Sequence, residues 1–278
     1  EHLSPQTDLL IYSPAVPESN LERQVAQELG IPQWSYPQAL GQLMHGHRGI
    51  SIAGTHGKST TTALVGHVLR QAGLAPSILC GAEMVDTGLN GVLGAESQPP
   101  TGSRMSERAQ FEKRLSGSFA LPDERVSHST QPILVAESCE YRGHFLELSP
   151  QVVGLLGIEP DHFDCFPTFD RAIATYREFI AKIPADGLLV ANRDCEATSS
   201  IVSASPARSV FVSTTDDQAD YFAKQVESTK AGLHIRVRLP DRTVLSITCP
   251  LWGLHHATNI LTALAMAIEQ GATPAELA

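Results

Sequence analysis

The sequence predicts an α/β fold with a doubly wound, mostly parallel sheet, and three observations carry that prediction. Short apolar runs alternate with amphipathic helical patterns, as in sheets that helices cover on both faces. A glycine-rich segment joins one apolar run to a helix, in the strand–loop–helix order of phosphate-binding sites. With 42% hydrophobic and 18% charged residues, the chain of 278 residues can bury a sizeable core.

The first elements follow from apolar spacing and capping residues. Residues 8–12 are expected to form a strand, and 20–29 an amphipathic helix that Asn20 caps. Residues 49–53 then predict a short buried strand. The helix expected at 58–72 follows it, and Gly73 closes that helix.

The later elements repeat this alternation. Short apolar runs predict four further parallel strands, at 133–136, 152–156, 188–191 and 209–212. The main helices between and after them are expected at 169–183 and 256–270. Two segments, 233–239 and 243–249, alternate apolar and polar residues around a Pro-Asp-Arg turn, so they predict an antiparallel hairpin at the sheet edge.

Charge and composition narrow the classes of function. With 20 Lys plus Arg against 30 Asp plus Glu, the formal charge is −10, which gives nucleic acid or an anionic membrane no general attraction. No apolar run approaches the roughly 20 residues that span a bilayer, and the start has no signal-peptide pattern. A cytoplasmic protein with small-molecule partners is therefore expected, with no indication of its oligomeric state.

Three further features of the sequence concern its cysteines, one polar segment and its two ends. The five cysteines are widely spaced without a CxxC pair, so reduced and mostly buried thiols are expected. Residues 98–131 lack a steady apolar spacing and predict a solvated, mobile insertion, the alternatives being a basic arm or a lid over the site. Thr273, Pro274 and Glu276 give a helix-start signal near the end of the chain. Both ends look cut from a longer protein.

The candidate phosphate-binding loop is Gly54-Thr55-His56-Gly57-Lys58-Ser59-Thr60. Backbone N–H groups at the start of the following helix would converge on an anion, while Lys58 would neutralise the β- and γ-phosphates. The Ser59 hydroxyl would bind Mg²⁺. Ile52 stands where the eight-residue consensus has its first glycine, so an ordinary glycine-rich turn is the alternative. The order of strand, loop and helix favours a nucleoside triphosphate site.

Two further groups of polar residues follow expected strands. Glu137 comes directly after the run at 133–136 and is the candidate Mg²⁺ ligand, whereas His162 lies in an acidic segment after the next run. Each could be a solvated loop residue. Because parallel strands deliver their C-terminal ends to one edge, Lys58, Ser59, Glu137 and His162 are expected to share one metal and phosphoryl site.

Four ordered motifs resemble the Mur ligases of peptidoglycan synthesis. They are residues 54–62 (GTHGKSTTT), 137–146 (ESCEYRGHFL), 158–164 (IEPDHFD) and 253–259 (GLHHATN). The histidine in the phosphate loop, the E-x-x-E-x-x-x-x-F-L stretch and the D-H-x-D stretch favour the member that joins L-alanine to UDP-N-acetylmuramate. The resemblance runs from about Asp8 to the end, and it is more specific for the family than for the member.

This resemblance implies an ATP-dependent carboxylate–amine ligase that forms its amide through an acyl phosphate, with ATP and Mg²⁺ as cofactors. By matching position, Lys58 would hold the phosphates, and Ser59 and Glu137 would hold the Mg²⁺. His162 would serve the acyl-phosphate region or a second metal.

The resemblance extends to further positions and to domains. His255 and Asn259 match a motif near the adenine pocket, and Ser13 weakly matches a segment that contacts the UDP moiety. Residues 1–46 would be the C-terminal part of the UDP-substrate-binding domain, a remnant of a Rossmann-like fold. Residues 47–271 would be the central ATP-binding domain, and 272–278 the start of a further domain. A chain without complete outer domains is expected to be inactive alone.

Departures from the family pattern leave other functions open. His256 and Gly157 stand where relatives usually have Asn, and Tyr176 stands where several relatives carry a carbamylated Lys, so no carbamate is expected. The alternatives are a ligase for recycled murein peptide, a folylpolyglutamate-type ligase, or a nucleotide-binding module without catalysis.

Overall fold

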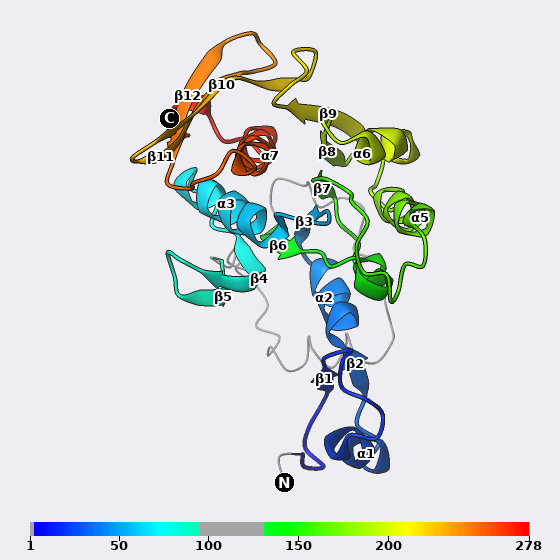
Figure 1. Ribbon diagram of the computed structural model, residues 1–278. Helices are drawn as coiled ribbons and strands as arrows, with labels where there is room; N and C mark the ends of the chain where they lie inside the picture. The colour runs from blue at the N-terminus through cyan, green and yellow to red at the C-terminus, as the bar shows by residue number, and fades with distance from the viewer. Residues whose placement is uncertain (1–2, 95–130, 278) are drawn as a thin grey trace.

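The buried apolar runs form the parallel centre of a ten-stranded sheet (Figure 1). The computed structural model describes residues 3–94 and 131–277. Its large sheet has the order β12-β11-β10-β9-β8-β7-β3-β6-β4-β5. All pairs from β10 to β4 are parallel, whereas β11 and β12 at one edge and β5 at the other run antiparallel. The predicted α/β class with a mostly parallel sheet is confirmed.

Every strand expected from an apolar run is present. They are β3 (Arg48–Ala53), β6 (Ile133–Glu137), β7 (Val152–Leu155), β8 (Leu188–Asn192) and β9 (Arg208–Ser213), with the hairpin β11 (Gly232–Arg238) and β12 (Val244–Cys249) at the edge. In this large sheet three further strands occur where none was expected, namely β4 (Ser77–Met84), β5 (Leu89–Val92) and β10 (Tyr221–Thr229). The expected insertion at 98–131 lies, apart from Gln131, outside the described residues.

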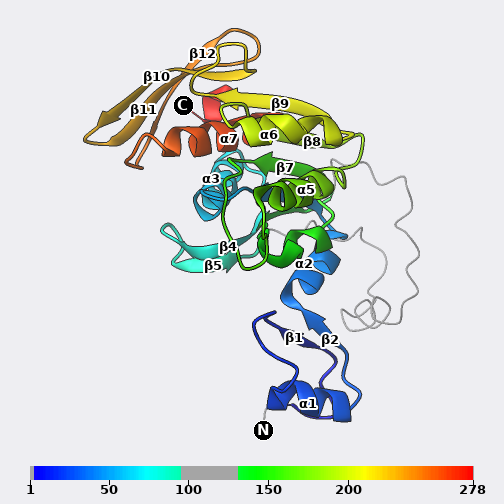
Figure 2. The same cartoon turned by 45° about the vertical axis from the view of Figure 1, so that its right-hand side comes forward.

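Helices cover both faces of the sheet (Figures 1 and 2). One face packs against α3 (Lys58–Gln71) and α7 (His256–Glu269), as their residues in the larger buried cluster show. The other face packs against α5 (Phe169–Ile180), α6 (Glu196–Ile201) and the short helix η2 (Tyr141–Glu147). This three-layer arrangement leaves the C-terminal ends of the strands as the edge at which loops can gather.

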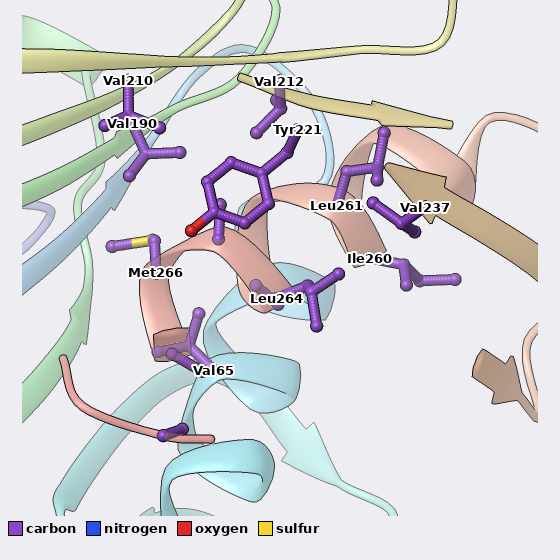
Figure 3. Close-up of a cluster of buried hydrophobic side chains, with 14 of the residues drawn as sticks. Val65, Val190, Val210, Val212, Tyr221, Val237, Ile260, Leu261, Leu264 and Met266 are labelled. Carbon is purple, nitrogen blue, oxygen red and sulfur yellow. The ribbon is translucent and has the colours of Figure 1, made fainter. Parts of the chain in front are cut away.

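Helix α7 is the most buried of the described helices. Ten of its fourteen residues are buried, and only Asn259 and Thr262 among these ten are polar. Figure 3 shows Ile260, Leu261 and Leu264 of α7 beside Val65 of α3 and Tyr221 of β10. A helix that is apolar on most sides is stable only when other elements surround it. Packing between α3 and the sheet therefore fixes the position of the α7 N-terminus.

The N-terminal residues form a separate small unit (Figure 1). β1 (Leu10–Tyr12) pairs in parallel with β2 (Gln33–Ser35), and α1 (Leu21–Glu28) connects them. The strand and helix expected here are confirmed, and Asn20 caps α1 by accepting the N–H groups of residues 22 and 23. β2 was not expected.

Helix α2 (Tyr36–Met44), which was not expected either, joins this unit to the large sheet. A Cβ at Gly41 would lie 2.2 Å from the backbone oxygen of Glu147, the last residue of η2. Only glycine allows α2 and η2 to approach so closely.

The cysteines only partly match expectation. All five are free thiols, but the expectation that most are buried is wrong, because only Cys80 is buried and Cys139 is exposed. Cys139 lies in the loop between β6 and η2 rather than in a strand.

Two further observations concern the chain as a whole. Among residues 3–94 and 131–277, no helix is both long enough and apolar enough to cross a membrane. The helix-start signal near the C-terminus is present as a capping box, in which Glu276 accepts hydrogen bonds from the backbone N–H (2.7 Å) and hydroxyl (2.8 Å) of Thr273. It begins a single helical turn, η4 (Pro274–Glu276).

Candidate active site

The glycine-rich loop joins β3 to α3, as predicted. Gly57 occupies the cap position before α3 with a φ of 82° and supplies no side-chain hydrogen bond to the helix N-terminus. The first N–H groups of a helix have no acceptor within the helix, so they can bind an anion at this end. A Cβ at Gly57 would lie 2.5 Å from Oδ1 of Asn259, so glycine is required here for space as well as for backbone conformation.

Lys58 folds back over its own loop. Its ammonium group donates hydrogen bonds to the backbone oxygens of Gly54 (2.7 Å) and Thr55 (3.1 Å). It also lies 2.9 Å from Oε2 of Glu140. The side chains of Lys58 and Glu140 are only 13% and 3% exposed, so little water screens this ion pair. The ammonium group therefore lies at the centre of the loop.

Glu140 also contacts a second predicted site residue. Nε2 of His162 is 3.3 Å from Oε1 of Glu140, so one buried carboxylate joins the lysine of the phosphate loop to the histidine that follows β7. Sequence reasoning gave no role to Glu140 and chose Glu137 because it comes first after its strand. The sequence did carry a signal for Glu140, because it is a second glutamate three residues after Glu137.

The phosphate loop is tied directly to the loop after β7. The N–H of Thr55 donates to the backbone oxygen of Gly157 (2.8 Å), and the N–H of Glu159 donates to the Thr55 hydroxyl (2.9 Å). That hydroxyl donates in turn to the backbone oxygen of Glu159 (3.2 Å). Gly157 contributes only its backbone, and a Cβ there would meet one atom at 3.8 Å, so its departure from the family pattern leaves this contact intact.

His162 has an unusual backbone. Its φ of 52° lies in the left-handed region, which non-glycine residues adopt at functional sites when surrounding contacts hold them there. Its ring meets the ring of Tyr141 edge to face, with 5.3 Å between centroids. The Tyr141 hydroxyl donates to Asp164 (2.7 Å), which lowers the pKa of Asp164 and raises the pKa of Tyr141.

Glu137 lies on the other side of the phosphate loop from His162. β3, which carries the loop, separates β6 from β7 in the sheet, and no contact joins Glu137 to His162 within the described residues. Oε2 of Glu137 accepts the N–H of Gly81 (2.7 Å). Sγ of Cys80 is 3.9 Å from the same oxygen and 3.4 Å from the backbone oxygen of Ser59. Glu137 and Ser59 are thus neighbours through Cys80.

The two predicted residues of α7 lie at its N-terminus. Asn259 is 7% exposed and packs against Gly57, so it lies beside the phosphate loop. Its Nδ2 is 3.3 Å from Nδ1 of His256. The rings of His255 and His256 have centroids 4.1 Å apart, and burial together with the charge of His255 lowers the pKa of His256.

The remaining predicted positions lie at the margins of the site. His56 is exposed at the tip of the loop, 3.9 Å from a carboxylate oxygen of Glu159. Thr60 lies in the first turn of α3. Ser13 is exposed in the N-terminal unit, where its hydroxyl accepts the N–H of Ala15, and it has no contact with the phosphate loop.

Tyr176 occupies a buried position on α5. It is 1% exposed, and its ring meets Phe145 edge to face at 5.2 Å. Burial raises its pKa, and the nearby charge of Glu140 raises it further. The phenol thus forms part of the low-dielectric wall that surrounds Glu140.

A model of the Mur ligase middle domain matches residues 52–267. The UDP-N-acetylmuramate–L-alanine ligase of Desulfitobacterium hafniense (strain Y51) is 31% identical over 266 residues, which are 96% of this chain and 51% of that protein. The chain therefore spans about half the length of the curated relatives that it matches.

Solved structures show the same fold at lower identity. The UDP-N-acetylmuramate–alanine ligase of Thermotoga maritima superimposes with a TM-score of 0.73 at 20% identity, covering 97% of this chain and 53% of that one. The UDP-N-acetylmuramate:L-alanyl-γ-D-glutamyl-meso-diaminopimelate ligase of Neisseria meningitides gives 0.74 at 23% identity, covering 97% and 78%. With a middle-domain match over most of its length, on a sheet whose phosphate loop, Glu140 and His162 meet at one edge, the chain belongs to the Mur ligase family.

Proposed function

We propose that this chain forms the nucleotide-binding centre of an ATP-dependent, cytoplasmic carboxylate–amine ligase that joins L-alanine to UDP-N-acetylmuramate. The observation that carries the proposal is the uncapped N-terminus of α3 with Lys58 directed across it. The named activity of the curated relatives supports the choice of substrates. Residues 47–271 would be the ATP-binding domain. Residues 1–46, with Ser13, would belong to the domain that binds the UDP substrate.

The residues fit ATP with Mg²⁺. Gly57 lets the Asn259 side chain pack against the helix start, where a Cβ would lie 2.5 Å from its Oδ1. The first N–H groups of the helix suit a polyphosphate. Ser59 and Glu137 would complete the coordination of a Mg²⁺ that is held mainly by phosphate oxygens and water. In the described parts of the chain, no group of three or more His, Cys, Asp or Glu side chains is arranged to hold a metal ion, and a metal that arrives with a nucleotide does not need one.

Each side chain has a separable task. When bound, ATP supplies the phosphoryl group that activates the substrate carboxylate. Lys58, which now bonds the backbone oxygens of Gly54 and Thr55, would bind the phosphate oxygens, and its charge would stabilise the transferring group. His162, which Glu140 holds, lies beside the phosphate loop and would orient the substrate carboxylate that accepts the phosphoryl group. His255 and Asn259 would line the nucleotide site from α7.

One alternative fits less well, and the others differ from the proposal only in their substrates. A nucleotide-binding module without catalysis would have no use for a buried carboxylate that joins Lys58 to His162 at the strand ends. A ligase for murein peptide or folylpolyglutamate shares this centre, and the substrates would distinguish it, because L-alanine with UDP-N-acetylmuramate would then give no product in the full-length ligase.

Calorimetric titration of this chain with Mg·ATP tests the proposal. Wild-type protein should bind, and Lys58→Ala should lose measurable binding because the phosphates lose their main cationic partner. Lys182→Ala, which removes an exposed lysine on the α5 side, is the matched control and should bind as wild type does. If Lys58→Ala binds Mg·ATP with the same affinity as wild type, the loop is not part of the nucleotide site.

A further inference from the structure

Strand β4 holds the candidate Mg²⁺ ligand by an arrangement that no sequence motif indicates. The pairing of β4 with β6 ends at Leu79 and Ala136, one residue before Glu137. Beyond that point the N–H of Gly81 is not part of the β4–β6 ladder. It donates instead to Oε2 of Glu137 at 2.7 Å.

Gly81 is required for this contact by its lack of a side chain. A Cβ at this position would lie 2.7 Å from Oε2, 2.9 Å from the carboxyl carbon and 2.9 Å from Oε1 of Glu137. The whole carboxylate therefore rests on the Cα of Gly81. Any other residue would displace the carboxylate or push β4 away from β6.

Cys80 contributes from the preceding position. Its side chain is buried and lies between the backbone oxygen of Ser59 (3.4 Å) and Oε2 of Glu137 (3.9 Å). A thiol has one proton, so it donates to one of these oxygens at a time. In either state it fills the space between the helix that carries Ser59 and the carboxylate.

We infer that Gly81 and Cys80 are positioning residues, which hold Glu137 in the conformation that directs its second oxygen, Oε1, to a Mg²⁺ beside Ser59. This inference rests on the proposed function, because it assigns Mg²⁺ to Glu137. Both contacts engage Oε2, so Oε1 is left for the cation. Partners of a metal ligand typically change metal affinity by about 10- to 100-fold when they are removed.

Calorimetry with ADP, in the presence and absence of Mg²⁺, tests this on the 278-residue chain. Wild type should bind ADP more tightly with Mg²⁺. In Gly81→Ala this enhancement should fall by about tenfold or more, while the affinity for metal-free ADP stays within about twofold, because Lys58 and the helix N-terminus are unchanged. Gly91→Ala is the control on the adjacent strand, since its Cβ would meet the flexible end of the Leu79 side chain at 3.3 Å and the backbone oxygen of Ile78 at an ordinary 4.0 Å. It should behave as wild type.

Cys80 variants give a second, milder test in case Gly81→Ala does not fold. Cys80→Ala should lower the Mg²⁺ enhancement by about two- to threefold, and Cys80→Ser should restore it, because a hydroxyl also donates a hydrogen bond. An unchanged enhancement in Gly81→Ala, or in Cys80→Ala if Gly81→Ala is unfolded, would overturn the inference and leave the proposed function in place. Failure of wild type to bind ADP at all would instead overturn the proposed function.

Discussion

At the scale of single residues, Glu140 is the most consequential side chain of the site. It is almost fully buried and faces two groups that can carry positive charge, Lys58 and His162. A buried carboxylate is stable only with such partners, and it holds both of them close to the phosphate loop. Glu140 therefore competes for Lys58 with the phosphates of an incoming nucleotide.

This competition gives a prediction for Glu140→Gln. The amide keeps the shape of the side chain but loses the charge, so Lys58 is released and ATP should bind more tightly, by up to about tenfold, or roughly 1.4 kcal/mol. Titration calorimetry on the nucleotide-binding chain measures this change. Glu159→Gln, at an exposed glutamate of the neighbouring loop, is the control and should shift affinity less than about twofold. Weaker binding by Glu140→Gln would mean that Glu140 positions Lys58 for phosphate rather than competing for it.

A site residue could be predicted from the sequence where its position along the chain already places it beside the phosphate loop. Lys58 and Ser59 follow a glycine and open a helix, so the sequence alone indicates their surroundings. Glu140 and Gly81 have no such signal, because their roles depend on which strands lie next to each other. The order β7-β3-β6-β4 brings them to the loop, and short apolar runs predict strands without predicting their order.

At the scale of elements, the strands that the sequence predicted have a regular pattern of apolar residues, whereas the strands that it missed do not. β10 contains a bulge between Ala223 and Gln225, so its apolar positions change face in mid-strand and the period of two is lost. The continuous apolar run of β4 covers only residues 78–80, because Gly81 and the exposed residues after it interrupt the run before the buried Met84. α2 did have readable signals, namely Ser35 and Gln38 in a capping box around Pro37.

The loop after β8 is another element whose stability depends on one carboxylate. Asp194 accepts hydrogen bonds from the Ser213 hydroxyl, from the N–H (2.7 Å) and hydroxyl (2.8 Å) of Thr214, and from the Thr215 hydroxyl (2.7 Å). Burial alone would raise the pKa of Asp194, but these hydrogen bonds outweigh it and lower that pKa below 3.8. The ionised side chain thus joins the ends of β8 and β9.

Asp194→Asn should therefore lower the free energy of unfolding at pH 7 by about 1–2 kcal/mol, a value that allows for partial exposure of the site. A carboxylate whose pKa is lowered by folding stabilises the protein above its unfolded-state pKa and loses that contribution as the pH falls through its folded-state pKa. The difference between variant and wild type should shrink towards zero below about pH 4. Urea denaturation at pH 7 and pH 3 measures it. Asp217→Asn, at an exposed aspartate nearby, should show no such pH dependence.

At the scale of the whole molecule, stability is unevenly distributed. The ten-stranded sheet buries strands such as β3 and β8 almost completely between two helix layers. The N-terminal unit has a two-stranded sheet, and Ala26 is the only buried residue of α1. Large apolar side chains there remain exposed, including Ile11 at 52% and Leu21 at 77%.

Hydrogen exchange followed by mass spectrometry should reproduce this division. Peptides from residues 10–35 should exchange within seconds to minutes, because an isolated two-stranded sheet is only marginally stable. Peptides from β3, β7 and β8 should be protected until global unfolding. Equal protection of both regions would show that the N-terminal unit and the large sheet unfold as one cooperative block.

The hydrogen bonds between Thr55 and residues 157–159 have a consequence for the energetics of ligand capture. A glycine-rich loop that is disordered before binding must lose backbone freedom worth about 1–2 kcal/mol per residue when it closes on phosphate. Here three hydrogen bonds already fix the loop to a neighbouring strand end, so that entropy is lost during folding instead. Less of the binding free energy is then used to order the loop, so the affinity for phosphate is higher. The loop acts as a rigid receptor for phosphate.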